Sequence, residues 1–207
     1  MQFTPDQSAV LTEILRWRRD VRHFRTDPVP EPVLDRLRQT MASAPSVGNA
    51  RPWRVIRVRD QGLRAAVRAE FCRCNALAAA TYDEPARADY LKLKLAGLDE
   101  APEHLAVFTH VDPAEGRSLG RQTMPATLRQ STAMAIHTLW LAARAENLGM
   151  GMVSILDPAQ VETLFSVPAT WEFSAYLCLG WPASHDDLPL LHRVGWQENQ
   201  PTDWDVR

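Results

Sequence analysis

Apolar residues recur at helical spacing in four stretches of the chain, and each stretch predicts a helix. The four predicted helices run over residues 6–19, 32–41, 63–80 and 127–148. Asp6 is the expected N-cap of the first, and Pro32 suits the first turn of the second. In the fourth, apolar groups lie nearly all round the helix, which predicts burial on most sides or a place in a subunit interface. Gly149 is expected to end that helix in a left-handed conformation.

Four shorter apolar runs predict strands. They cover residues 53–59, 105–108, 150–156 and 173–181. The second and the last are apolar on both sides, so we expect both to be buried and the last to be a central strand. Asp157 and Pro158 follow the third run with the residue types of an N-cap and a first helical position, which predicts one more helix.

Three segments show little periodicity. Residues 44–53 hold two prolines and a glycine, which predicts an ordered loop whose Ser46 hydroxyl and Asn49 amide could face an anion or a polar ring. A plain connecting turn is the alternative there. Residues 82–102 lie between a predicted helix and a predicted strand and suit a lid over a site. Residues 182–207 are too aromatic to be disordered, and we expect this tail to wrap over another surface.

Composition narrows the classes of function. We find no internal repeat and no domain boundary, so a single domain is expected over residues 1–207. The net charge of −2 gives no general attraction to nucleic acid or to anionic membranes. No leader-like N-terminus or membrane-length apolar run occurs, and the three cysteines fit neither a disulfide framework nor a zinc site. These features predict a cytoplasmic protein with free thiols.

The run from Arg18 to Phe24 is the strongest candidate for a site. The guanidinium groups of Arg18 and Arg22 could clamp a phosphate, which lysine could only approximate. A solvated helix end, with its cations near the last carbonyls, is the alternative. Asp20 lies among these cations, which favour its charged form and suit a base. Its alternative role is that of a salt-bridge partner for the arginines.

The chain has no metal motif, no nucleophile elbow and no Gly-rich phosphate loop, and the absence of GxGxxG argues against a Rossmann dinucleotide site. Instead, anion-binding and amide groups recur on the segments 18–22, 46–49 and 151–154. Such groups beside apolar walls suit a flat heteroaromatic ligand that carries a phosphate. His137 has no carboxylate or cysteine at ligand spacing, so we interpret it as a buried or interfacial residue rather than a catalytic one.

Two of these segments resemble the nitroreductase family. Residues 18–24 resemble its opening Arg-Arg-Ser motif, and residues 44–53 resemble its Ala-Pro-Ser loop that ends in Pro-Trp. Gly149–Gly151, Asp157–Pro158 and Leu179–Pro182 follow in the family's order, so the resemblance covers about residues 11–182. It implies an α+β fold with a mixed β-sheet flanked by helices, FMN at a homodimer interface, and a C-terminal tail that extends to the partner subunit.

One branch of the family is more similar than the rest. Asp20 stands where many members carry serine, and residues 153–158 and 176–180 also resemble this branch. The branch consumes its own flavin: it fragments reduced FMN with O2 into 5,6-dimethylbenzimidazole, the lower ligand of cobalamin, and erythrose 4-phosphate. NAD(P)H then enters only indirectly, as a source of reduced flavin that the protein makes itself or receives from a separate flavin reductase. Two alternatives stay open: an FMN-dependent NAD(P)H reductase of nitro or quinone compounds that keeps its flavin, and a flavin-storage protein.

The resemblance implies residue roles position by position. The implied flavin-binding residues are Arg18, Arg19, Asp20, Val21, Arg22, Ser46, Asn49, Gly151 and Ser154. Asp20 is implied to accept and return protons, and Ser154 to orient the flavin through its hydroxyl. For Ser154 the alternative is a buried hydroxyl bonded to a neighbouring carbonyl. Arg51 stands where glutamine is common in the family, so it is left out of the predicted site, and no metal is expected.

Overall fold

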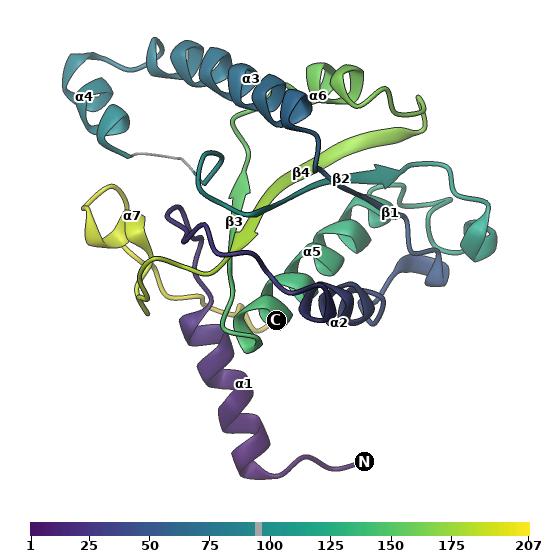
Figure 1. Cartoon of the computed structure of the whole chain (residues 1–207). Helices are drawn as coiled ribbons and strands as arrows, with labels where there is room; N and C mark the ends of the chain where they lie inside the picture. Colours follow the sequence, from purple (N-terminus) through teal and green to yellow (C-terminus); the bar gives the residue numbers. More distant parts are fainter. Residues whose placement is uncertain (94–96) are drawn as a thin grey trace.

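The computed structural model describes residues 1–93 and 97–207. A four-stranded sheet in the order β1-β2-β4-β3 forms its centre, with helices on both faces (Figure 1). The strands are β1 (Trp53–Arg57), β2 (Glu103–His110), β3 (Gly149–Val153) and β4 (Trp171–Gly180). The predicted α+β class and the central place of the last strand are confirmed. All four strands pair antiparallel. In the described residues, the parallel pairing expected of a mixed sheet is limited to one bridge between Asp20 and Met150.

The two central strands alternate between two apolar layers. Val107 and Leu177 pack in the layer beneath α2 (Glu31–Met41) and α5 (Thr127–Ala145). Phe108 and Tyr176 pack in the opposite layer, beneath α3 (Gln61–Ala79) and α6 (Pro158–Leu164). All four side chains are fully buried. Because successive strand residues point to opposite faces, these apolar runs need helices on both sides, as Figure 1 shows.

The first helix, α1 (Pro5–Trp17), has no buried residue. Its N-cap is Thr4, whose hydroxyl accepts a hydrogen bond from the Gln7 backbone while the Gln7 side chain accepts one from the Thr4 backbone. The predicted N-cap, Asp6, is wrong because Pro5 takes the first helical position and places Asp6 inside the first turn. The apolar side of α1 stays open to solvent in this chain.

The end of α5 differs from the prediction. The helix ends at Ala145, and Asn147 takes the left-handed conformation with a φ of 61°, since asparagine tolerates this region better than most residues. Gly149 opens β3 instead of capping α5, so its predicted role is wrong. A Cβ atom at Gly149 would lie 2.7 Å from Cγ2 of Val21, so glycine serves close packing at this position.

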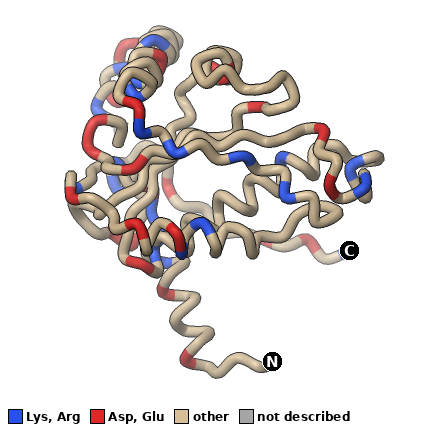
Figure 2. Tube along the Cα trace, turned by 45° about the vertical axis from the view of Figure 1, so that its right-hand side comes forward, with Lys and Arg blue, Asp and Glu red and all other residues tan. Residues whose placement is uncertain are grey.

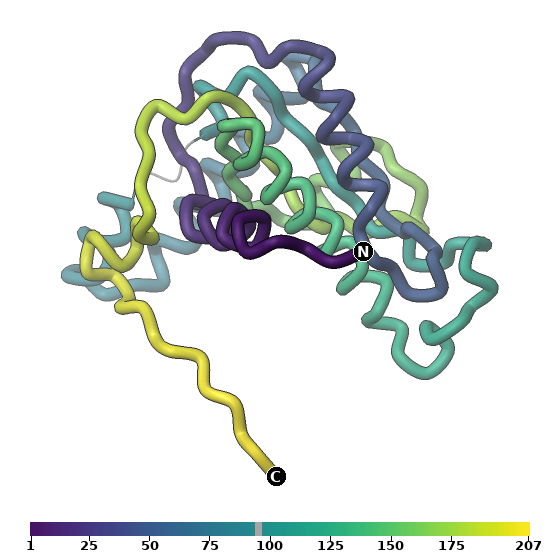
Figure 3. Tube along the Cα trace, turned by 90° about the horizontal axis from the view of Figure 1, so that it is seen from below, coloured from purple at the N-terminus to yellow at the C-terminus, as the bar shows by residue number. Residues whose placement is uncertain are grey.

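The predicted lid and tail meet on the surface of the same chain. The predicted lid holds α4 (Glu84–Lys92), and its residues 94–96 lie outside the described residues. The tail holds α7 (Leu190–Arg193), and the Trp196 ring lies 6.0 Å from Tyr82 and 6.4 Å from Tyr90, centroid to centroid. Residues 198–207 are exposed and lead away from the rest of the chain (Figure 3). None of the described helices is both long and apolar enough to span a membrane.

Candidate functional site

The segment that follows α1 lies against β3, an edge strand of the sheet. The Val21 N–H donates to the Met150 carbonyl (3.1 Å), and the Met152 N–H donates to Oδ1 of Asp20 (2.9 Å). This approach requires Gly151, because a Cβ atom there would lie 2.2 Å from the Val21 carbonyl oxygen. The predicted arginine cluster is therefore attached to the strand that leads to Ser154.

Asp20 and Ser154 line one cavity of about 300 Å³, here called the β3 cavity. Ser154 is exposed, which excludes the buried-hydroxyl alternative. The cavity's other walls are mostly apolar or backbone groups, contributed among others by Val21, Arg22, Phe71, Trp140, Gly151 and Cys178. Burial raises the pKa of the Cys178 thiol to about 12, so this group is protonated at neutral pH and does not act as a thiolate nucleophile.

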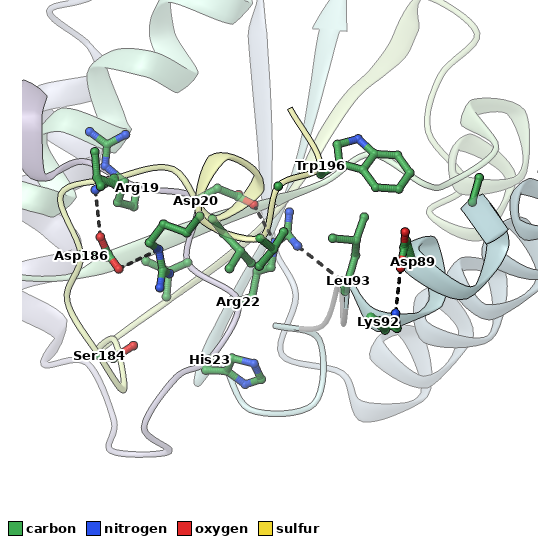
Figure 4. A pocket seen from close by; sticks show the side chains of 17 residues that line it. Arg19, Asp20, Arg22, His23, Asp89, Lys92, Leu93, Ser184, Asp186 and Trp196 are labelled. Atoms are coloured by element: carbon green, nitrogen blue, oxygen red, sulfur yellow. Dashed lines mark hydrogen bonds and ion pairs between the residues drawn. The ribbon is translucent and has the colours of Figure 1, made fainter. Parts of the chain in front are cut away.

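A larger cleft of about 540 Å³ lies between α4 and α7 and shares Asp20, Val21 and Arg22 with the β3 cavity (Figure 4). We call it the α4–α7 cleft. Two of its cations are paired within the cleft, Lys92 with Asp89 and Arg193 with Asp186, each at 2.8 Å.

The other two cations of the cleft, Arg19 and Arg22, are more weakly neutralised. The Arg22 Nε lies 3.4 Å from Oδ2 of Asp20, a long contact. The Arg19 Nε is buried and has no partner among the described residues. Burial is also the main cause that lowers the pKa of the Arg19 guanidinium. A buried, unpaired guanidinium nitrogen favours an anionic group nearby.

Arg18 faces another direction. Its guanidinium carbon lies 5.1 Å from the ring centroid of Trp140, in a cation–π contact, and it lines a small hollow with Arg144 and His185. Arg18 and Arg22, the pair predicted to clamp a phosphate, therefore line different cavities in this structure. Arg19 and Arg22 share one.

The predicted loop with Ser46 and Asn49 lies far from residues 18–22, at the other end of the sheet in both Figure 1 and Figure 3. The Ser46 hydroxyl accepts a hydrogen bond from the Arg51 N–H (3.0 Å), and Ser131 accepts one from the Val47 N–H (3.0 Å). The loop itself contains η1 (Val47–Asn49). Asn49 lines a shallow hollow beside a second turn, which contains η2 (Glu115–Ser118). One chain thus brings together the predicted site residues of 20–22 and 151–154 in one cavity, and not those of 46–49.

The sequence did not identify several residues of the two cavities. Phe71, Trp140 and Cys178 belong to predicted helices and a strand, where apolar residues are ordinarily core. Lys92 and Arg193 carry no local signal, because only the packing of α4 beside α7 brings them together. The aromatic character of the tail was the one signal that pointed toward Trp196.

Charge is mixed over the whole molecule. Basic and acidic residues are interspersed along the trace in Figure 2, without a large surface of one sign. An anion would therefore be held by local groups such as Arg19 and Arg22 rather than by a long-range field. Within residues 1–93 and 97–207, no group of three or more His, Cys, Asp or Glu side chains is placed to hold a metal ion. His137 is exposed on α5, which excludes the buried interpretation within this chain.

The two cavities together suit an elongated ligand. Their shared border at residues 20–22 joins a mostly apolar space to a cleft that Arg19 and Arg22 line. A flat ring in the first and an anionic end toward the second satisfy both environments. The carboxylate of Asp20 lies at the border, where it can exchange a proton with a bound molecule.

Comparisons with known proteins give a consistent picture. The profile of the nitroreductase family matches residues 15–181. A 5,6-dimethylbenzimidazole synthase of Rhodobacter capsulatus is 62% identical over 207 residues, which is 100% of both chains. A second protein of that name, from Rhodospirillum rubrum, is 50% identical over 199 residues and covers 96% of this chain and 94% of its own length. A crystal structure of oxidized iodotyrosine deiodinase bound to FMN and 3-iodo-L-tyrosine has the same fold, with a TM-score of 0.73 at 23% identity over 95% of this chain and 97% of that chain.

Proposed function

This chain belongs to the nitroreductase family, and from that premise we propose that it fragments reduced FMN with O2 into 5,6-dimethylbenzimidazole and erythrose 4-phosphate. The observation that carries the proposal is the placement of Asp20 and Ser154 in the β3 cavity. These residues carry the resemblance to the flavin-consuming branch, and relatives named for its product align over nearly the full length. The activity for which these relatives are named therefore agrees with the residues that line the β3 cavity.

The residues present fit a flavin. Phe71, Trp140 and the backbone at Gly151 offer apolar and flat walls in the β3 cavity, which suits an isoalloxazine ring. Arg19 and Arg22 line the adjoining cleft, and their positive charges suit the phosphate end. The Arg19 Nε has no partner among the described residues, whereas Nη2 of the same group donates to the Arg16 carbonyl. FMN, once bound and reduced, would supply the carbon atoms of 5,6-dimethylbenzimidazole and of erythrose 4-phosphate and the electrons that O2 accepts, and its remaining pyrimidine-ring atoms would leave as a separate fragment.

Asp20 holds and moves the proton. Its Oδ1 is held by the Met152 N–H, so the carboxylate has a defined orientation, while Oδ2 lies on the side of Arg22. A carboxylate so fixed accepts a proton from a bound molecule and returns it, which a serine at the same position could not do at neutral pH. Ser154 is exposed in the same cavity, and its hydroxyl orients the bound molecule through a hydrogen bond.

The site needs a second copy of the chain if the Ser46–Asn49 loop takes part. That loop lies at the other end of the molecule from Asp20, so the proposed site combines residues 18–22 of one subunit with Ser46 of the partner subunit and the partner's Asn49. The open apolar side of α1, where Val10 is 59% and Leu11 is 52% exposed, supports a homodimer. We further propose one domain over residues 1–207, a cytoplasmic location, residues 82–102 as a lid, and residues 198–207 as the part of the tail that reaches the partner.

The test is an incubation of purified protein with excess reduced FMN in air, followed by mass spectrometry. The proposal expects 5,6-dimethylbenzimidazole to accumulate over many turnovers, and not in a matched anaerobic incubation. Flavin that is only reoxidised and recovered intact would overturn the proposal. In that case, NAD(P)H oxidation coupled to a nitro or quinone acceptor would support the reductase alternative, and FMN binding without any turnover would support storage.

A comparison of flavins tests the anion contacts separately. The proposal expects FMN to bind at least about tenfold more tightly than riboflavin, because charge-assisted bonds from two arginines to a phosphate are lost in riboflavin. Titration of the flavin fluorescence measures both affinities. Equal affinities would show that Arg19 and Arg22 do not bind the phosphate.

A further inference from the structure

The loop that carries Ser154 is anchored at its far end by helix α3. The loop spans residues 154–157 between β3 and α6, and α3 lies beside α6 (Figure 1). The backbone N–H of Asp157 donates to Oε1 of Glu70, at 3.3 Å. Arg73, one turn along α3, lies 3.7 Å from the Asp157 carboxylate. Two residues of α3 thus contact the last residue of the Ser154 loop.

Glu70 is a buried carboxylate whose oxygens are bonded on all sides. Its side chain is only 8% exposed. Arg73 donates to both oxygens, at 2.8 and 2.6 Å, and the Cys74 thiol donates to Oε1 at 3.1 Å. These bonds, the one from Arg73 above all, hold the pKa of Glu70 down at about 2, so it stays charged. Burying a charged carboxylate costs free energy, so the location of Glu70 next to the Ser154 loop requires an explanation.

The near end of the same loop is also anchored. Val153 pairs with Tyr176 in the sheet, and the preceding Met152 N–H donates to Asp20. Between the two ends, the Leu156 side chain is 8% exposed and packs in the core. The loop is therefore held by Asp20 at one end and by Glu70 at the other, which leaves Ser154 a narrow range of positions in the β3 cavity.

We infer that Glu70, braced by Arg73, is a positioning residue for the reaction proposed above: it fixes loop 154–157 so that the Ser154 hydroxyl faces the cavity that Asp20 lines. The inference rests on the proposed function. Phe71, the next residue of α3, lines that cavity itself, so α3 sets both a wall of the site and the loop opposite. Neither Glu70 nor Arg73 lines the cavity. Glu70 acts through the backbone N–H of Asp157, and Arg73 acts through Glu70 and the Asp157 carboxylate.

Two variants test the inference. Glu70→Gln keeps the shape of the side chain but replaces one acceptor oxygen with an amide N–H₂ group. That group would face an N–H or S–H donor, because both oxygens of Glu70 accept hydrogen bonds. Arg73→Lys keeps the charge but cannot donate to both oxygens in the same way. Glu146→Gln is the matched control, since this carboxylate, at the C-cap of α5, pairs with Arg36 of α2 at 2.8 Å for each oxygen and does not line the cavity.

Three quantities are measured for each variant: amide hydrogen exchange of residues 152–157 without flavin, the dissociation constant of FMN, and the rate of product formation at saturating reduced FMN. In Glu70→Gln and Arg73→Lys, exchange of the loop is expected to rise about tenfold and the rate to fall about tenfold, because small displacements of an orienting group are costly. The FMN dissociation constant is expected to stay within about threefold of wild type, because neither residue lines the cavity. Glu146→Gln is expected to match wild type in all three.

Unchanged loop exchange, or an unchanged rate, in both Glu70→Gln and Arg73→Lys would overturn the inference. If Glu70→Gln does not fold, Arg73→Lys decides alone, because it retains the buried carboxylate. A wild-type protein that forms no 5,6-dimethylbenzimidazole would overturn the proposed function instead, and the exchange measurement would still report whether Glu70 holds the loop.

Discussion

Asp20 uses its two carboxylate oxygens differently. Oδ1 accepts from the Met152 backbone, whereas Oδ2 lies beside Arg22 at the border of the two cavities. Asp20→Asn keeps an oxygen for the Met152 N–H, so the local backbone is preserved, but an amide does not take up a proton. We expect product formation to fall by at least about 100-fold, the usual contribution of a general base, with FMN affinity within about threefold of wild type.

Mass spectrometry of the product and a fluorescence titration with FMN measure these two effects. Asp27→Asn is the control, because Asp27 also pairs with an arginine, Arg25, but on the exposed surface. An Asp20→Asn enzyme with wild-type turnover would reduce Asp20 to the salt-bridge role that the sequence left open.

Gly149 and Gly151 allow the approach of residue 21 in different ways. A Cβ atom at Gly149 would meet the Val21 side chain, whereas one at Gly151 would meet the Val21 carbonyl oxygen, at 2.2 Å. We expect Gly149→Ala to lower the melting temperature by several degrees and Val21→Ala to restore much of the loss, since that change removes the Cγ atoms.

Gly151→Ala is expected to weaken FMN binding by at least about tenfold, and Val21→Ala should not rescue it, because the opposing atom belongs to the backbone. Rescue of both variants, or of neither, would contradict the distinction.

At the scale of elements, α4 and the tail pack against each other and line the α4–α7 cleft, and we propose that they act as its cover. Tyr82 and Tyr90 stack with ring centroids 5.0 Å apart, and Trp196 packs against both. Ion pairs between Arg16 and Asp187 and between Arg193 and Asp186 hold the connecting tail. The aromatic contacts of the cover thus join segments about a hundred residues apart in the sequence, and contacts of this kind open locally without global unfolding.

Trp196→Ala tests this cover. Loss of the indole removes the aromatic contact between tail and α4, and we expect amide exchange over residues 84–92 to rise about tenfold and FMN affinity to fall several-fold. Leu77→Ala provides the control, because that side chain is 59% exposed and belongs neither to the tail nor to the two cavities. If the two variants behave alike, the tail does not hold α4 in place.

At the scale of the whole molecule, one buried histidine ties stability to pH. His104 lies on β2, where its side chain is buried and its Nδ1 lies 2.9 Å from the Tyr176 hydroxyl. Burial, with a smaller effect of Arg64, lowers the pKa of His104 to about 4. In the unfolded chain the pKa returns to about 6.5, so between these values the unfolded state binds a proton that the folded state excludes. The free energy of unfolding therefore falls as the pH drops from about 6.5 to about 4, and this effect levels off below.

Chemical denaturation at pH 7 and pH 5.5 measures the effect. The part due to His104 is expected to be about 1 kcal/mol, and His104→Gln should lack it even if the variant is less stable at both pH values. His185→Gln is the control, because His185 lies exposed on the surface, where its Nδ1 is 3.2 Å from Nη1 of Arg144. A His104→Gln protein with the full wild-type pH dependence would place the cause elsewhere.

The separation of Asp20 from the Ser46–Asn49 loop leads to a prediction about assembly. If the site combines Asp20 with the partner's Asn49, then Asp20→Asn and Asn49→Ala subunits should each be inactive alone and complement each other when mixed by refolding. Each mixed dimer would have one intact site and one doubly altered site. Random pairing then restores about a quarter of the wild-type product formation. No recovery, together with a dimeric mass by light scattering, would show that each site draws on one chain, and a monomeric mass would contradict the dimer itself.

Much of the local structure follows from the sequence alone. The helical periodicities, the doubly apolar runs of β2 and β4, and the Asp157–Pro158 start of α6 each depend on neighbours a few residues apart, and the structure confirms them. Two local predictions were wrong because a nearby residue takes the predicted role. Thr4 caps α1 in place of Asp6, and Asn147 adopts the left-handed conformation predicted for Gly149. The motifs also identified the segments around Asp20 and Ser154, which the structure does bring to one cavity.

Only the tertiary structure decided which side chains meet. The stacking of Arg18 on Trp140, the shared cleft of Arg19 and Arg22, the distance to the Ser46–Asn49 loop and the anchoring of loop 154–157 by Glu70 have no signature in local spacing. The physical reason is one of range. Backbone preference and hydrophobic periodicity act between residues a few positions apart, whereas a site depends on the register of strands and the packing of helices that bring together residues remote in the chain.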